Sequence, residues 1–219
     1  RCRLVGSEMC IRDSYYTVQP GFSTGISVTN NSDRTQVLKI RMRRATDAMG
    51  ALDFNLVLSP HDTWSGSLSA IEEAGPLTGL PVIKLFTDDS SCTVPSNAGS
   101  LTMPEIFRVG AEEGYIELIG MGTPVDESQP IATFAAPDAG GIPVNCVRVS
   151  DNFRRGLWPG DYYPDWAGFT NSSSRTRGVV NSALSAQWTN GIGAETVSNT
   201  YTDTDNVLSV SYYIRNCLL

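Results

Sequence analysis

The strongest constraint on the fold of this chain is the alternation of apolar and polar residues from 26 to 68. Four runs of this kind are separated by Asn, Asp, Gly and Pro. Successive side chains of an extended chain point to opposite faces, so a period of two buries one face and leaves the other in water. No window of this length keeps apolar residues at helical spacing without Gly, Pro or a β-branched run in between. The pattern therefore predicts half-buried antiparallel strands.

Two of these runs define the expected core most clearly. The side chains predicted to point inward are Leu38, Ile40, Met42, Leu52, Phe54, Leu56 and Leu58. Those predicted to face water are Lys39, Arg41, Arg43, Asp53 and Asn55. Full burial of one large apolar side chain contributes about 1.5–3 kcal/mol, which outweighs local propensity when several such residues share a face. We therefore expect one face of each strand to be core and the other wet.

Further strands are expected at 15–18, 81–86 and 114–119, with a loop at 71–79. About seven strands with short, fairly even turns predict an all-β fold. The favoured architecture for 15–122 is an immunoglobulin-like, two-layer antiparallel β-sandwich. A closed barrel is the alternative.

The chain becomes less regular after residue 122. Residues 123–141 are rich in Pro, Ala and Gly and are expected to form a long connection, with a short helix at 145–155. Strands are expected again at 178–188 and 207–214. The loop-rich region 123–216 either completes the sandwich or starts a second β domain.

Both ends of the chain resemble translated sequencing-adapter DNA. Residues 3–14 match such a translation and 1–2 are expected to be index bases, while 217–219 resemble the same adapter read from the other strand. We therefore expect 1–14 and 217–219 to be artefacts around a bacterial metagenomic fragment. The signal peptide would then lie in sequence that is missing from the fragment.

The composition favours a secreted β protein. The chain has 16 basic and 23 acidic residues, a formal net charge of -7. An acidic chain is poorly suited to phosphate backbones, so nucleic acid is disfavoured as a partner. No membrane span is expected in the fragment, and Ser, Thr, Asn and Gly are abundant, as on the surfaces of secreted proteins.

The cysteines point to an oxidising compartment. Of five cysteines, Cys2, Cys10 and Cys217 fall in the end segments, which leaves Cys92 and Cys146. An even pair without CxxC spacing predicts one disulfide. Two unpaired buried thiols are the alternative.

Several motifs resemble a group of uncharacterised secreted proteins found mostly in gammaproteobacteria. They include Tyr-Tyr-Thr-Val at 15–18, Ser-Cys-Thr-Val-Pro at 91–95 and Glu-Gly-Tyr-Ile-Glu-Leu-Ile at 113–119, with further similarity at 26–31 and 52–64. The resemblance covers about 15–146 and is loose beyond 157. It implies export and a β-rich fold, and it implies no particular activity.

Catalytic and metal-binding patterns are weak. A hydrolase triad needs a base oriented by a carboxylate and a nucleophile within reach, and sequence neighbours on a turn rarely achieve this. His61, the single histidine, follows Pro60 and precedes Asp62, so we expect a turn residue. One histidine and two paired cysteines are too few for a zinc cluster. The sequence therefore predicts no enzyme, no metal site and no cofactor.

The charged groups have ordinary explanations. Acid pairs occur at 72–73, 88–89 and 112–113, and adjacent strand residues face opposite ways, unlike the carboxyl pair of a glycosidase. We therefore interpret each acid pair as solvated turn charge. Residues 203–206 carry oxygen-bearing side chains of the kind that bind calcium, but they lack the Gly and the distant Glu of an EF-hand loop. A turn is therefore favoured over a calcium site. The basic row consists of Lys39, Arg41, Arg43 and Arg44. We interpret it as a solvated strand face or a charged edge rather than an anion site.

An aromatic loop at 158–166 is the best candidate for ligand binding. Its rings are Trp158, Tyr162, Tyr163 and Trp166. Such rings either stack on sugars or pack back onto the sandwich. The sequence thus favours a non-enzymatic secreted, periplasmic or cell-surface protein with a structural or interaction role, its partner a surface protein or a glycan. The alternatives are a carbohydrate-binding module that uses this loop and an enzyme whose active site lies partly in missing sequence.

Overall fold

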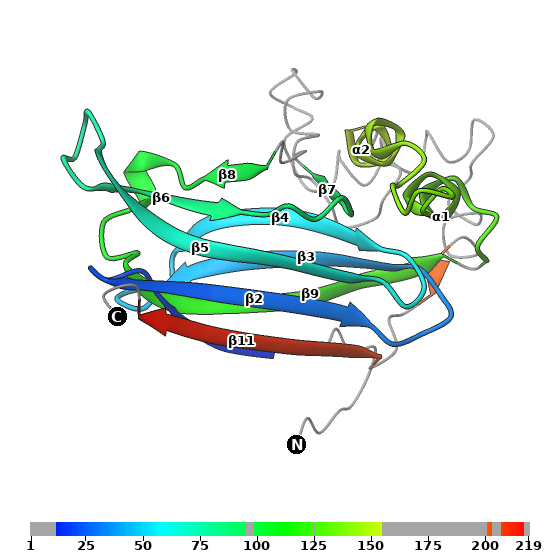
Figure 1. The fold of residues 1–219 in the computed structure, drawn as a ribbon, viewed down its shortest axis with the longest axis horizontal. Helices are drawn as coiled ribbons and strands as arrows, with labels where there is room; N and C mark the ends of the chain where they lie inside the picture. The colour runs from blue at the N-terminus through cyan, green and yellow to red at the C-terminus, as the bar shows by residue number, and fades with distance from the viewer. Residues whose placement is uncertain (1–11, 95–98, 125, 155–200, 203–206, 217–219) are drawn as a thin grey trace, which may run out of the picture.

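The computed structural model describes residues 12–94, 99–124, 126–154, 201–202 and 207–216. They form two antiparallel sheets stacked face to face (Figure 1). The first sheet has the order β1-β9-β3-β4-β7, with β10 paired to β9, and the second has the order β11-β2-β5-β6-β8. The predicted all-β antiparallel sandwich is confirmed, and the separate sheets exclude the closed barrel.

The strands of the first sheet are β1 (Arg12–Thr17), β3 (Gln36–Arg44), β4 (Gly50–Leu58), β7 (Cys92–Val94), β9 (Glu113–Pro124) and β10 (Tyr201–Thr202). Those of the second sheet are β2 (Phe22–Asn30), β5 (Thr63–Ala74), β6 (Pro81–Phe86), β8 (Ser100–Thr102) and β11 (Leu208–Asn216). A short 3-10 turn, η1 (Glu105–Phe107), and two helices, α1 (Pro130–Ala135) and α2 (Cys146–Arg154), complete the described elements.

The alternating apolar residues of the strands meet between the two sheets, as predicted. Register pairs Leu38 with Leu56 and Ile40 with Phe54, and all four side chains are fully buried. Trp64, from the second sheet, packs on Phe54 at a ring-centroid distance of 5.5 Å with tilted rings. Tilted aromatic contacts add to the burial term. The core predicted from alternation is therefore the core of the sandwich.

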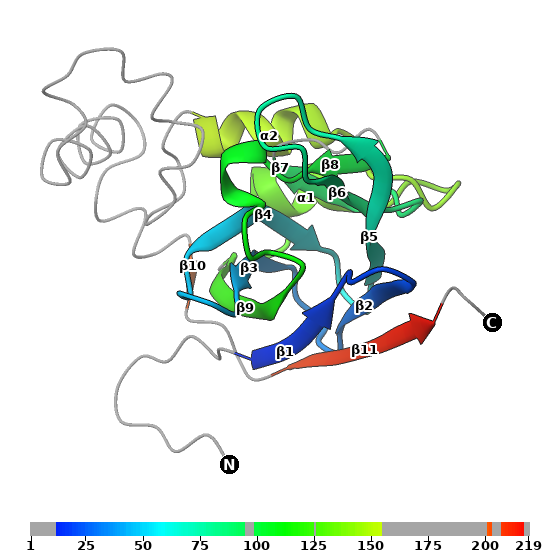
Figure 2. The same ribbon diagram turned by 90° about the vertical axis from the view of Figure 1, so that its left-hand side faces the viewer.

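The outer face of the first sheet is not wet throughout, which corrects the expectation that the second face of every strand is exposed to water. Val37 and Val57 point away from the sandwich core, yet they are buried in a second cluster with Ile131 and Ala135 of α1 and Val149 of α2. Figure 2 shows the two helices lying over this end of the sheets. A third, helical layer covers the outward valines because apolar β-branched residues on a sheet face are stable only when something excludes water from them.

Several boundaries differ from the sequence prediction. The predicted loop at 71–79 is shorter, because β5 continues to Ala74 after a register shift that follows Ile71. The predicted long connection after 122 contains the end of β9 and helix α1. The first strand begins at Arg12 rather than at residue 15, since ladder pairing uses backbone groups that nearly every residue has.

The helix predicted at 145–155 is confirmed as α2, and the strand predicted at 207–214 is confirmed as β11. β11 pairs with β2, and β10 pairs with β9. Strands from the end of the chain thus join both sheets formed by its first part. The predicted strand at 178–188 lies outside the described residues.

Candidate functional site

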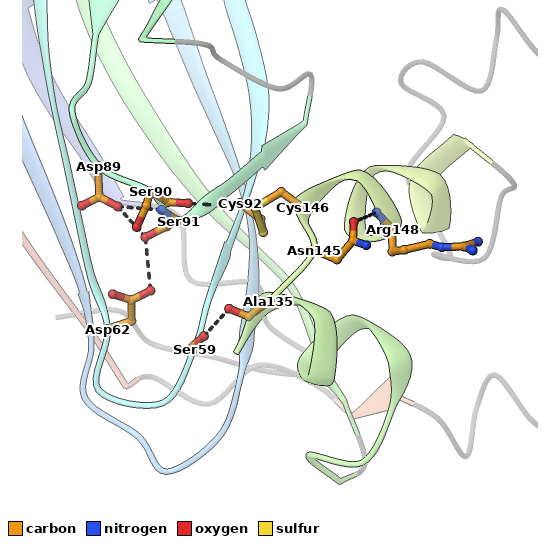
Figure 3. Close-up of a disulfide and its surroundings, with 10 residues drawn as sticks. All are labelled: Ser59, Asp62, Asp89, Ser90, Ser91, Cys92, Ala135, Asn145, Cys146 and Arg148. Atoms are coloured by element: carbon orange, nitrogen blue, oxygen red, sulfur yellow. Dashed lines mark hydrogen bonds between the residues drawn. A yellow bond between two sulfur atoms is a disulfide. The ribbon is translucent and has the colours of Figure 1, made fainter. Parts of the chain in front are cut away.

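The predicted disulfide joins Cys92 to Cys146 (Figure 3). Cys92 lies in β7, at the margin of the first sheet, and Cys146 is the first residue of α2. The two residues are 54 positions apart, and the Cys92 side chain is buried. The bond therefore ties the helical layer directly to the sheet that it covers.

Hydrogen bonds around the disulfide hold the same layer. The Ser59 hydroxyl, just after β4, donates to the Ala135 carbonyl at 2.8 Å and fixes the end of α1 (Figure 3). The Asn145 side-chain oxygen accepts the Arg148 backbone N–H at 3.0 Å, which caps the first turn of α2. The contacts near the disulfide thus fix the end of α1 next to β4 and stabilise the first turn of α2.

A pocket of about 680 Å³ opens at another part of the sandwich. Its walls come from the β1–β2 turn, from β5 and β6, and from the segment between η1 and β9. The buried floor includes Val18 and Ile83, while Phe22 and Pro81 form an exposed rim. Pockets of 300–1,000 Å³ with mostly apolar walls are the usual form of small-ligand sites.

Arg108 is the cation of this pocket. The residue is only 6% exposed, and its Nε donates to the Met103 carbonyl at 3.0 Å. Its Nη1 is buried and has no hydrogen-bond partner among the described residues. Burial acts to raise the pKa of neighbouring Glu105, but hydrogen bonds from the backbone N–H groups of Thr78 and Leu77 and the charge of Arg108 lower it overall. The charge of Arg108 therefore acts on Glu105 and favours its ionised form.

Glu112 contributes the second charge of the pocket wall. Burial, and then the negative charge of Glu112, raise the pKa of Tyr16, while Arg44 opposes the shift. The Tyr16 hydroxyl donates to the Ala111 carbonyl at 3.2 Å and stays protonated. Glu112 belongs to an acid pair that the sequence had assigned to solvated turns. Its place in an apolar pocket comes from packing between segments far apart in the chain.

The basic row is a half-buried face of paired charges at Arg41 and Arg43, and its last member, Arg44, is buried and paired with Asp47. Arg41 Nε lies 3.3 Å from an Asp53 carboxylate oxygen, and Arg43 Nε lies 2.5 Å from one of Glu117. Opposite charges on neighbouring strands stabilise a sheet modestly. The charged-edge alternative is wrong, because β3 lies between β9 and β4 in the sheet.

His61 is a turn residue, as predicted, with a left-handed backbone conformation of φ 59°. Its Nε2 lies 2.7 Å from an Asp33 carboxylate oxygen, and both side chains are exposed. The described residues place no hydroxyl or thiol in hydrogen-bond contact with the ring. The sequence did not indicate that Asp33 would contact His61, because the two residues lie in different turns that only the fold brings together. Asp62, the sequence neighbour of His61, instead accepts a hydrogen bond from Ser91.

The remaining predicted sites fall where the structure gives no description. Trp158, Tyr162, Tyr163, Trp166 and the segment 203–206 lie outside the described residues, so sugar stacking and the turn at 203–206 stay predictions. Within the described part of the chain, no group of three or more His, Cys, Asp or Glu residues could hold a metal ion. None of the helices in that part is long and apolar enough to span a membrane.

No protein-family model matches this chain, and a comparison with curated proteins finds no significant match. The resemblance to secreted proteins of gammaproteobacteria therefore stays a prediction.

Proposed function

We propose that this chain is a non-enzymatic β-sandwich protein exported to the periplasm or the cell surface, where it acts through interaction with other molecules. The disulfide between Cys92 and Cys146 is the observation that carries this proposal. Disulfides of this structural kind form and persist in oxidising compartments and are rare in the reducing cytosol.

The position of the disulfide strengthens the argument for export. It fastens α2 over Val37 and Val57, which would otherwise present apolar surface on the outer face of the first sheet. In a reducing compartment this layer would rely on short helices and a few hydrogen bonds. Helices of six and nine residues are marginal without tertiary support. The protein is therefore suited to a compartment that keeps the bond closed.

The compartment can be tested by producing the chain in the bacterial cytosol and in the periplasm. We expect the periplasmic protein to contain a non-reduced peptide pair that links Cys92 to Cys146. Limited proteolysis should then spare residues 126–154, whereas the cytosolic protein should be cut there. Equal protease resistance and free thiols in both preparations would contradict export.

The pocket supports an interaction role and suggests the chemistry of a ligand. Its walls include Val18, Ile83 and Phe22, and the charge of Arg108 acts on Glu105. Glu112 leaves a negative charge on the wall. An uncharged apolar group therefore fits better than an anion, because a carboxylate would lose hydration next to a like charge.

Binding of 1-decanol and decanoate, followed by NMR chemical shifts, tests this ligand class. We expect the alcohol to bind more tightly than the anion, and Ala70→Trp, which fills the pocket, to abolish binding. Ala139→Trp makes the same change on an exposed loop and should leave binding intact. Equal binding to both variants would exclude the pocket as the site. A panel of ester, glycoside and peptide substrates tests the absence of turnover separately.

A further inference from the structure

We propose that β11 pairs edge to edge with β11 of a second copy of this chain, so that two five-stranded sheets become one continuous antiparallel sheet. This goes beyond the proposed function and depends neither on export nor on the pocket. Among the described strands β11 pairs only with β2, alternate backbone groups of β11 face away from β2, and its sequence is complementary to itself about a two-fold axis.

β11 is the long edge of the second sheet. Its nine residues all pair with β2, from Leu208 opposite Asn30 to Asn216 opposite Phe22, without a register shift. Among the described strands β2 is its only partner, and Figure 1 shows β11 at the margin of the molecule. The opposite edge, β8, has three residues.

The residues of β11 itself provide none of the usual protection against pairing. Natural edge strands are blunted by proline, bulges, lysine or short length. β11 contains none of these, and Arg215 is its single charged residue. Tyr212, Tyr213 and Ile214 are 49%, 63% and 41% exposed, respectively. A strand of this kind is a template for β-sheet extension.

The backbone groups that face outward follow from the ladder. The Asn31 N–H donates to the Val207 carbonyl at 2.9 Å, which makes these two residues a hydrogen-bonded pair. Hydrogen-bonded and non-bonded pairs alternate along an antiparallel ladder. Ser211 and Tyr213 therefore bond to β2, whereas the N–H and C=O groups of Tyr212 point away from β2 toward the open edge.

A second copy of the strand fits this edge. A two-fold axis at Tyr212 places Tyr212 opposite Tyr212 of the other copy, and Val210 opposite Ile214 of the other copy. These residues all have backbone groups that face away from β2, so they can meet as hydrogen-bonded pairs. Arg215 then lies opposite Ser209, and no like charges face each other. Aromatic and β-branched cross-strand pairs are favourable. An unrelated peptide would match the backbone but not this symmetry.

The test compares two proline substitutions by sedimentation equilibrium and thermal unfolding. The wild-type chain of 23.7 kDa should show a concentration-dependent dimer. Tyr212→Pro removes an outward N–H in both copies, and so two symmetric hydrogen bonds, and should weaken dimerisation roughly tenfold to a hundredfold with little change in monomer stability. Ser211→Pro removes an N–H bonded to β2 and should instead lower the unfolding temperature of the monomer.

A second variant keeps the test independent of proline effects. Tyr212→Lys places like charges opposite each other at the two-fold axis and should also weaken the dimer. A wild-type chain that stays monomeric at all concentrations overturns the proposal. So does a dimer that tolerates both Tyr212→Pro and Tyr212→Lys.

Discussion

Removal of the disulfide by Cys92→Ala with Cys146→Ala should destabilise the protein mainly through its unfolded state. The bond joins residues 54 positions apart. In the chain-entropy model, opening a loop of this size costs about 4 kcal/mol of unfolding free energy. For a chain of this size, 1 kcal/mol shifts the unfolding midpoint by roughly 2–4 °C, so the expected decrease is roughly 8–16 °C.

Removal of the disulfide should lower the stability of the helical layer more than that of the sheets. The disulfide fixes α2 on the first sheet, and Val149 is buried against the outward valines. Without the bond, α1 and α2 are held by their apolar packing on the sheet and by hydrogen bonds such as that from Ser59 to Ala135. Backbone amides of 146–154 should therefore lose hydrogen-exchange protection, while those of β3 and β4 keep most of theirs.

Urea unfolding of the oxidised wild type, the reduced wild type and the double variant is the assay. The reduced wild type should resemble the double variant, and reductant should leave the double variant unchanged. A loss of less than about 1 kcal/mol would mean that the loop is already constrained in the unfolded ensemble. Equal exchange protection in α2 with and without the bond would contradict its assigned role as an anchor.

Two further predictions concern packing and pH. A Cβ at Gly114 would lie 1.8 Å from the Arg43 carbonyl oxygen, so Gly114→Ala should destabilise by about 2 kcal/mol or more. Gly50→Ala, whose Cβ meets nothing closer than 3.8 Å, should be nearly neutral in the same unfolding assay. The pKa of Glu105 is lowered: burial opposes the shift, but hydrogen bonds from 77–78 outweigh it. Its stabilisation is therefore complete above the unfolded carboxyl pKa of about 4.3 and is lost as pH falls through the lower folded value. Glu105→Gln should unfold with a shallower dependence on acid pH, and an unchanged dependence would contradict this origin.

The sandwich core could be predicted because its signal is local. Leu38, Ile40, Phe54 and Leu56 alternate with polar residues, and the pleat of a strand converts that alternation into an inner and an outer face. The helix that begins at Cys146 could also be predicted, and the disulfide followed from the cysteine count, because only two cysteines lie outside the end segments. The strands and the helix need no knowledge of which segments become neighbours, and two cysteines allow a single pairing.

The candidate sites could not be predicted in the same way. Val37 and Val57 looked like ordinary strand residues, and only α1 and α2, some distance along the chain, show what covers them. Arg108 and Glu112 have no motif, and their role as pocket walls depends on strands from the first half of the chain. Each of these contacts joins segments that are far apart in the sequence, and no motif of fixed spacing marks the contact.

The sequence by itself determined that this protein is built from antiparallel strands, because side-chain alternation is set by backbone geometry within each strand. Tertiary structure alone decided the order of strands in the two sheets, the helical layer on the outer face, the pocket and the open edge of β11. The physical reason is that the hydrophobic effect is non-directional. An apolar strand face is stabilised by any segment that covers it, so the local sequence pattern does not specify which segment that is.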